Sequence, residues 1–245
     1  MTELLAGTHW YPISDPPRFG ILPLILGSLV VTVGATVLAV PVGVASALYI
    51  AEVAPAGIRD VMKAGIEMLA AIPSVVIGFI GMVTLVPFVK RLFGLPTGLT
   101  ALSGSIMLGF MAMPTIVSIA EDAIAAVPTE YKQGALALGA TRWQMLYRVV
   151  LHAASPGILA AVMLGIGRVI GETMAVMMIT GNAAVIPESF LAPVRTMTAT
   201  IAADMGETVK GSLHYQALFA IGIVLFSITF VVNLVADIFL HKIKR

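Results

Sequence analysis

An all-α, polytopic membrane protein is the fold class that this sequence predicts, and three observations support it. Of the 245 residues, 59% are hydrophobic and only 11% are charged, whereas soluble domains carry about 25% charged residues. The charges leave long uncharged runs, each close to or above the ~20 apolar residues that a spanning helix needs. These runs lack the alternation of barrel strands, so helices are the remaining way to satisfy the backbone in lipid.

Five transmembrane helices are predicted within a single transmembrane domain over residues 1–245. The predicted spans cover residues 19–51, 68–89, 92–120, 153–182 and 211–240. The first run exceeds one bilayer crossing, so we expect it to tilt, to kink at Pro41 or to begin in the interface near Pro23. A cytoplasmic loop over 129–152 and an extracytoplasmic loop over 183–210 are expected between the later spans.

The orientation is predicted from Lys and Arg in the short loops. With residues 129–152 in the cytoplasm, most of these basic residues lie inside, including those of the C-terminal HKIKR. The expected location is a cell (inner) membrane, with several passes and a cytoplasmic C-terminus. The N-terminal MTELLAGTHWYP has no basic n-region, so it is not a signal peptide. Five spans then place the N-terminus outside, which suggests that a preceding helix is missing or truncated.

Several function classes are disfavoured by composition. A net charge of +1 gives no support for a nucleic-acid partner, and the absence of cysteine removes disulfides and thiol chemistry. No GxxxxGK[ST] phosphate loop occurs, so any ATPase must be a separate polypeptide. We therefore expect no catalytic residue, no metal and no cofactor.

A polar stretch interrupts the apolar chain between Glu130 and His152. Thr141 followed by Gln144 forms a capping box, and Gly139 suits the left-handed end of a helix that begins near Thr129. The second helix carries an apolar stripe of Trp143, Leu146 and Val150, with Arg142 and Arg148 elsewhere on its surface. These residues fit two interpretations: an amphipathic helix lying on the membrane, or a docking element for a soluble partner.

The spacing of this stretch resembles the coupling signature of ATP-binding-cassette (ABC) importer permeases, in which Glu-Ala-Ala is followed by a Gly and then by Ile-x-Leu-Pro. The aligned residues are Gln133, Gly134, Ala135, Gly139, Val149, Leu151 and His152. Ala135, Gly139 and Leu151 match, whereas the charged Glu and the Pro of the signature are replaced. The resemblance implies an ATPase-coupling loop that includes Gln133, Gly134, Ala135, Gly139, Arg142 and Leu151.

The remainder of the chain is similar to the PstC-type permease subunit of phosphate-specific ABC importers. The similar stretches include IEMLAAIPSVVIGFIG, ALALGATRWQ, SPGILAAVMLGIGRVIGETMAVMMITGN and HYQALFAIGIVLFSITFVVN. The resemblance implies a transporter subunit, not an enzyme, that forms half of a translocation pathway. It also implies four kinds of partner: a homologous PstA-type permease, two ATP-binding subunits, an extracytoplasmic phosphate-binding protein and membrane lipid. An importer of another oxyanion (phosphonate, sulfate or molybdate) and a proton-coupled carrier are the alternatives.

Arg168 and Glu172 are the two charges inside the fourth predicted span. Four residues apart, they are expected on one face of a helix, and charges at this depth are costly and usually mark a pathway. A guanidinium suits an anionic substrate, and the matching positions in the resembled family imply a substrate pathway of Arg168, Glu172 and Thr173. A self-neutralising structural pair is the alternative.

Other residues are expected to have structural roles. Small-residue stripes for close helix packing are predicted at Gly157, Ala161 and Gly165 and at Gly167, Gly171 and Ala175. Paired or snorkelling anchors are expected at Lys63 with Glu67 and at Asp237 with His241, whereas Glu121 and Asp122 are expected to be solvated. A short helix beginning at Pro193, with Val194, Met197 and Ile201 on one face, is expected either as a solvated loop helix or with a docking or gating role.

Overall fold

The protein is described by a computed structural model over residues 2–243. Contacts within the chain group into two compact units. The first unit combines Met1–Leu38, Pro73–Met111 and Arg168–Val231, and the second combines Ala39–Ile72, Ala112–Gly167 and Val232–Arg245. The longest helices contribute residues to both units, so neither unit is one continuous stretch of chain.

The first unit begins with a short helix and a two-stranded hairpin. α1 (Thr2–Ala6) leads into the antiparallel strands β1 (Trp10–Tyr11) and β2 (Arg18–Phe19). The long helix α2 (Leu22–Leu48) follows almost directly. A buried apolar cluster packs this N-terminal segment against α11 (Met197–Asp204) and α12 (Leu213–Ile243), which lie later in the same unit. It comprises Trp10, Ile21, Leu24, Met197, Ala217, Leu218 and Ile221.

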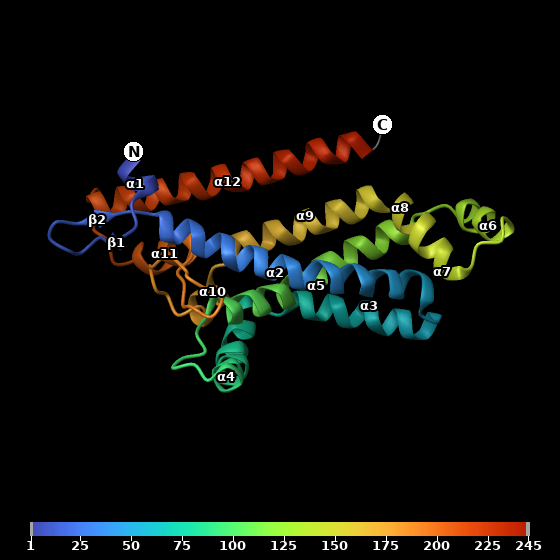
Figure 1. Ribbon diagram of the computed structural model, residues 1–245, viewed down its shortest axis with the longest axis horizontal. Helices are drawn as coiled ribbons and strands as arrows, with labels where there is room; N and C mark the ends of the chain where they lie inside the picture. The colour runs from blue at the N-terminus through green and yellow to red at the C-terminus, as the bar shows by residue number, and fades with distance from the viewer. Residues whose placement is uncertain (1, 244–245) are drawn as a thin grey trace. The chain divides into compact units, whose positions relative to one another are not determined.

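The other helices of the first unit are α4 (Ser74–Phe93), α10 (Met174–Ile179) and α11 (Met197–Asp204), with the N-terminal parts of α5 (Ala101–Ala125) and α12 (Leu213–Ile243). α10 packs closely on α4 (Figure 1). A Cβ built on Gly78 would lie only 2.9 Å from the Cα of Ala175. Glycine is therefore needed at this crossing, because a side chain would force the two helices apart.

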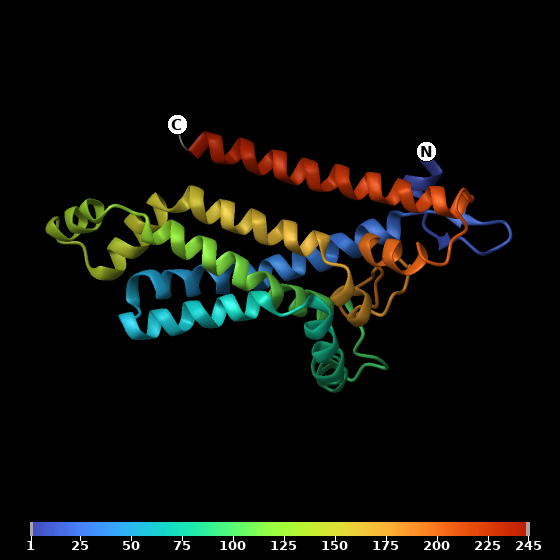
Figure 2. The same ribbon diagram turned by 180° about the vertical axis from the view of Figure 1, so that it is seen from behind.

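The second unit contains the polar stretch. α2 continues into the π-helical segment η1 (Tyr49–Val53), which is followed by α3 (Ala56–Ala71) and the C-terminal part of α5. The chain then forms α6 (Thr129–Ala137), α7 (Arg142–Gln144), the π-helical segment η2 (Met145–Val150), α8 (Leu151–Ala153) and most of α9 (Ser155–Gly171). Figure 2 shows α9 running beside α5.

Glycines set the close approach of α9 to α5. A Cβ on Gly157 would lie 2.4 Å from the Cβ of Ala123, one on Gly165 would lie 2.5 Å from Ile116 Cγ1, and Ala161 between them is fully buried. The first predicted packing stripe is therefore confirmed. In the second, only Ala175 packs closely, on Gly78 of α4, whereas a Cβ on Gly167 or on Gly171 would meet open space among the described residues.

Among the described residues, four helical segments are long and apolar enough to cross a membrane: Leu22–Val53, Ser74–Phe93, Ala101–Ala125 and Leu213–Ile238. A fifth is added if the bent pair Arg142–Ala153 and Ser155–Gly171, whose axes differ by 68°, forms one span. The predicted all-α, polytopic fold class is confirmed by these helices.

Some helix limits differ from those predicted from the charges. α4 runs through Lys90 and Arg91 and ends where Gly94 takes a φ of +62°, because cations in a final helical turn interact favourably with its carbonyls. The next helix, α5, begins only at Ala101. The continuous helix predicted over 153–182 is wrong, because α9 ends at Gly171 and α10 begins at Met174.

Candidate translocation site and coupling hairpin

The predicted pathway residues lie at a helix break in the first unit. Arg168 occupies the last turn of α9, whereas Glu172 and Thr173 belong to neither α9 nor α10. The Glu172 N–H donates to the Val169 carbonyl at 3.2 Å, three residues back instead of four, and so closes the final turn. The prediction that Arg168 and Glu172 share one face of a continuous helix is therefore wrong, although both lie within one short segment.

Hydrogen bonds hold Glu172 in place from two directions. Its carboxylate oxygen Oε1 accepts from the Ala175 N–H at 3.2 Å, which satisfies a free donor at the start of α10. The Thr198 hydroxyl of α11 donates to the Glu172 carbonyl at 2.8 Å. Thr173 donates to the Gly171 carbonyl at 3.2 Å. Arg168, Glu172 and Thr173 are all partly buried, so this segment offers a guanidinium, a carboxylate and a hydroxyl at a fixed, partly open bend.

The central part of the segment over 183–210, which contains α11, is packed and not solvated. α11 begins at Met197 with Thr196 as its N-cap, whose hydroxyl accepts from the Ala199 N–H at 3.2 Å. The predicted start at Pro193 is therefore wrong. Met197 and Ala199 are buried, and the Met197 N–H donates to Ser28 Oγ of α2 at 3.0 Å. The alternative of a solvated loop helix is excluded by this burial.

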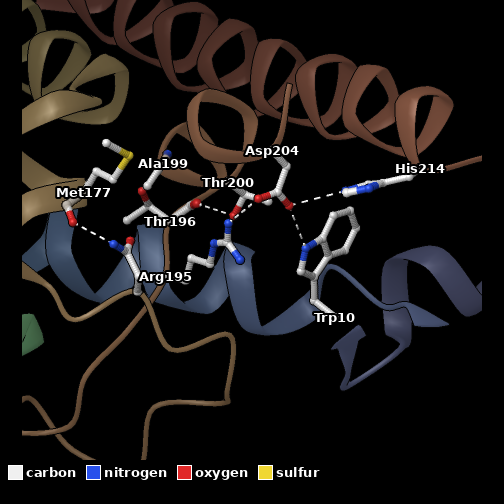
Figure 3. Close-up of polar contacts among 9 residues, drawn as sticks. Trp10, Met177, Arg195, Thr196, Ala199, Thr200, Asp204 and His214 are labelled. Carbon is white, nitrogen blue, oxygen red and sulfur yellow. Dashed lines mark hydrogen bonds and ion pairs between the residues drawn. The ribbon is translucent and has the colours of Figure 1, made fainter. Parts of the chain in front are cut away.

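One carboxylate at the end of α11 contacts three parts of the first unit: β1, the segment before α11 and the start of α12 (Figure 3). Asp204 accepts from Arg195 Nη2 at 2.6 Å and from Trp10 Nε1 at 3.3 Å, and its other contact is His214 Nε2 at 3.3 Å. A carboxylate at a helix C-terminus is unfavourable, and the Arg195 guanidinium offsets this cost. α11 is thus held at one end by Asp204, while Thr198 near its other end holds Glu172.

The polar hairpin in the second unit has the predicted local geometry. Thr141 Oγ1 accepts from the Gln144 N–H at 3.3 Å and Gln144 Oε1 accepts from the Thr141 N–H at 2.9 Å, which confirms the capping box. Gly139 has a φ of +84°, as expected for a left-handed helix end. α6 begins at Thr129, also as predicted. The hairpin therefore has a stiff turn with defined helix ends.

The apolar stripe predicted for the second helix of the hairpin is wrong in one member. Leu146 and Val150 are buried, but Trp143 is 72% exposed. Tyr147 is similarly exposed, at 76%. The residues from Met145 to Val150 form a π-helix, whose wider turn breaks the 3.6-residue period on which the prediction relied. The side chains of Trp143 and Tyr147 are therefore on the surface, and Tyr147 was not identified from the sequence.

The predicted coupling residues divide into two groups. Gln133, Gly134, Gly139 and Arg142 are exposed. Ala135 and Leu151 pack against the buried cluster formed by η1, α5 and η2. The first group thus lies at the hairpin surface, and the second attaches the hairpin to the rest of its unit.

The charges near α3 and α5 pair differently from the prediction. Lys63 Nζ lies 2.6 Å from Glu121 Oε2 and 3.8 Å from Asp122 Oδ1. Glu121 is 3% exposed, so the expectation that it is solvated is wrong, whereas the Asp122 side chain is exposed. Lys63 therefore has Glu121 as its near partner, and not the predicted Glu67. The side chain of His241, predicted to pair with Asp237, lies outside those that the structure describes.

Comparison with known proteins places this arrangement in a family. Residues 39–245 match the model of the binding-protein-dependent transport system inner membrane component. The chain is 42% identical over 228 residues to the probable ABC transporter permease protein YqgH of Bacillus subtilis, covering 93% of this chain and 74% of that protein. It is 35% identical over 260 residues to the phosphate transport system permease protein PstC of Mesorhizobium japonicum, covering 98% and 79%.

The fold has solved counterparts. A chain from inward-facing conformations of the MetNI methionine ABC transporter superposes with a TM-score of 0.69 at 17% identity, covering 95% of this chain and all of that one. The family model and these relatives, together with the multi-pass helical fold, define the class of protein as a membrane permease. The chain belongs to the family of binding-protein-dependent transport system inner membrane components.

Proposed function

We propose that this chain is a permease subunit of an ATP-driven importer of inorganic phosphate. The observation that carries the proposal is its similarity, along 98% of its length, to a phosphate transport system permease. The helix break at Arg168–Thr173 is consistent with this substrate, because a guanidinium and a hydroxyl can both donate to a phosphate oxygen.

The proposed complex has four further polypeptides. A homologous PstA-type permease would complete the pathway, two ATP-binding subunits would supply the energy, and an extracytoplasmic protein would deliver phosphate. Membrane lipid would surround the two permease subunits. In this arrangement residues 129–152 and the C-terminus are cytoplasmic, and residues 183–210 face outward.

Arg168, Glu172 and Thr173 would line this chain's half of the pathway. Discontinuous membrane helices commonly form substrate sites, because irregular backbone is tolerated where it lines a cavity. Glu172 would restrain the Arg168 guanidinium between turnovers. The Ala175 N–H donates to the Glu172 carboxylate and the Thr198 hydroxyl donates to the Glu172 backbone carbonyl, and these bonds would keep the residue in place while the anion passes.

The hairpin α6–α7 would dock on an ATP-binding subunit. Its surface presents Gln133, Gly134, Gly139 and Arg142 together with the exposed aromatic ring of Trp143. Aromatic and Arg side chains are the usual anchors of protein interfaces. The stiffness of the turn supports this role, since a rigid element transmits displacement without absorbing it.

Transport in proteoliposomes tests the proposal. The permease pair, the ATP-binding subunits and the binding protein would be reconstituted, and uptake of phosphate, sulfate and methylphosphonate would be measured with and without ATP. We expect phosphate uptake that needs ATP and the binding protein. Uptake that follows a proton gradient without either, or that prefers another oxyanion, would contradict the proposal.

A further inference from the structure

A partly buried ion pair joins the hairpin to the end of the first long helix. Lys132 Nζ of α6 lies 2.5 Å from Glu52 Oε1 of η1, and the two side chains are only 17% and 11% exposed. Charge-assisted hydrogen bonds in such shielded surroundings are short, strong and directional. The pair therefore links two elements 80 residues apart in the sequence.

The η1 end of this link is held firmly. Arg59 of α3 donates through Nε to the Ile50 carbonyl at 2.9 Å and through Nη2 to the Ala51 carbonyl at 2.7 Å. These bonds satisfy acceptors that a helix end otherwise leaves free. Ile50 and Ala51 are themselves buried in the apolar cluster of the second unit. Glu52 thus projects from a backbone that cannot easily shift independently of its neighbours.

The hairpin end of the link is held by fewer contacts. Neither α6 nor α7 has a fully buried residue, and Ala135 is the residue of α6 that packs partly against the apolar cluster. Apolar contacts of this kind allow sliding, because they have no preferred direction. The Lys132–Glu52 pair, in contrast, fixes a distance and an orientation. A displacement of α6 must therefore carry η1 with it or break the pair.

We propose that Glu52 is a positioning residue for energy coupling, which passes movement of the hairpin through Lys132 to η1 and the C-terminal part of α2. The inference rests on the proposed function, in that an ATP-binding subunit moves the hairpin. It assigns a role to two charges outside the signature residues. A purely structural fastening is the competing explanation.

Glu52→Gln is the informative variant, because the amide keeps the shape and one acceptor oxygen but loses the charge. Asp60→Asn is its matched control, since Asp60 is an exposed carboxylate on the neighbouring helix α3. The double variant Glu52→Lys, Lys132→Glu restores a pair of opposite charges with its direction reversed. All variants would be measured in the assembled, reconstituted complex.

Phosphate imported per ATP hydrolysed is the first readout. We expect Glu52→Gln to lower this ratio by at least about fivefold, the lower end of typical couplings between sites, while the complex still assembles and hydrolyses ATP. Asp60→Asn should match the wild type, and the double variant should regain most of the lost ratio. An unchanged ratio in Glu52→Gln, or loss of assembly that the reversed pair does not repair, would overturn the proposal.

A second readout does not depend on the substrate. Spin labels on cysteines at Tyr49 and Leu136, both about two-fifths exposed at 42% and 43%, would report the distance between η1 and α6. We expect ATP to leave this distance unchanged in the parent protein and to alter it in Glu52→Gln; the same ATP response in both would contradict the inference. If the complex imports no phosphate but this difference is seen, the substrate assignment fails and the coupling role of Glu52 stands.

Discussion

Lys63 of α3 neutralises Glu121 of α5 across 2.6 Å, although the Glu121 side chain is only 4% exposed and that of Lys63 is 42% exposed. The hydrogen bond with Glu121 raises the pKa of Lys63, as do the charges of Glu121 and Asp122, while burial and Arg59 act in the opposite direction. The protonated form of Lys63 is therefore favoured by folding. Its contribution to stability is present below the ordinary pKa of 10.5 and is lost as the pH rises through the higher value of the folded protein.

Replacing Lys63 should expose the cost of this buried carboxylate. We expect Lys63→Met to destabilise the detergent-solubilised protein by about 2 kcal/mol, since a buried charged acceptor loses its donor. The melting temperature of the parent protein should fall more steeply than that of Lys63→Met above pH 10.5. Glu67→Gln is the control, because Glu67 is exposed on the same helix. Equal alkaline behaviour of parent and Lys63→Met would rule out the pair as a source of stability.

Two glycines on α9 should respond in opposite ways to the same change. Gly157→Ala places a methyl group 2.4 Å from Ala123 Cβ, so we expect a loss of about 1–3 kcal/mol from overpacking. Gly167→Ala meets open space among the described residues and should be neutral or stabilising by up to ~1 kcal/mol, the difference in helix propensity. Thermal unfolding in detergent measures both. A similar loss in both variants would mean that helix geometry, not the α5 contact, is limiting.

Arg168 and Glu172 should give different transport defects if they line the pathway. Arg168→Gln should reduce phosphate uptake by at least about tenfold through loss of a charge-assisted contact, with normal assembly, because removing a cation favours membrane insertion. Glu172→Gln keeps an acceptor for the Ala175 N–H, so we expect a folded complex with altered or leaky uptake. A double variant that regains normal uptake would instead identify a structural pair.

The exposed aromatic residues of the hairpin should anchor the ATP-binding subunit. We expect Trp143→Ala to weaken its binding about tenfold or more, as for a central aromatic contact of an interface, and Tyr147→Ala to act in the same direction. Binding of the purified ATP-binding subunit to permease in nanodiscs measures this. Phe226→Ala removes a similarly exposed ring, 70% exposed, from the last long helix. Binding as strong as the parent's in both hairpin variants would favour a hairpin that lies on the lipid.

The proposed orientation predicts opposite accessibility of positions 143 and 210. Because the chain has no cysteine, Trp143→Cys and Lys210→Cys each introduce a single probe, and both native residues are exposed. A membrane-impermeant maleimide applied to intact cells should label position 210 and leave position 143 unlabelled until the membrane is opened. The reverse pattern would invert the topology.

Features that depend on neighbouring residues could be predicted from the sequence, whereas contacts between residues far apart in the sequence could not. The capping box at Thr141 and the left-handed Gly139 depend on a few neighbouring residues, and the small-residue stripe from Gly157 to Gly165 depends on helical spacing alone. These predictions are confirmed. Glu121 pairs with Lys63, 58 residues earlier in the sequence, and Glu52 pairs with Lys132, 80 residues later. No periodicity in the sequence predicts such pairs.

The helix break at Glu172 was missed for a related reason. Gly171 and Thr173 are weak helix formers, yet the apolar run around them has the length of a span, and composition favoured one continuous helix. The deciding contact is the Thr198 hydroxyl on the Glu172 carbonyl, which comes from a segment 26 residues later. The π-helical turn at Met145–Val150 likewise has no local signature that a 3.6-residue pattern detects.

That π-helical turn makes the hairpin sensitive to insertions and deletions in a way that substitutions do not reveal. Its wide turn holds more residues than an α-helical turn of 3.6, so losing one residue there could restore ordinary α-helix without breaking the chain. Each residue of an α-helix advances the side chains by about 100°. A one-codon deletion near Val149 would then preserve composition, hydrophobicity and helix content. It would nevertheless turn Trp143 and Arg142 to a different side relative to α9, so alignment gaps at this point would separate relatives whose hairpins present different surfaces.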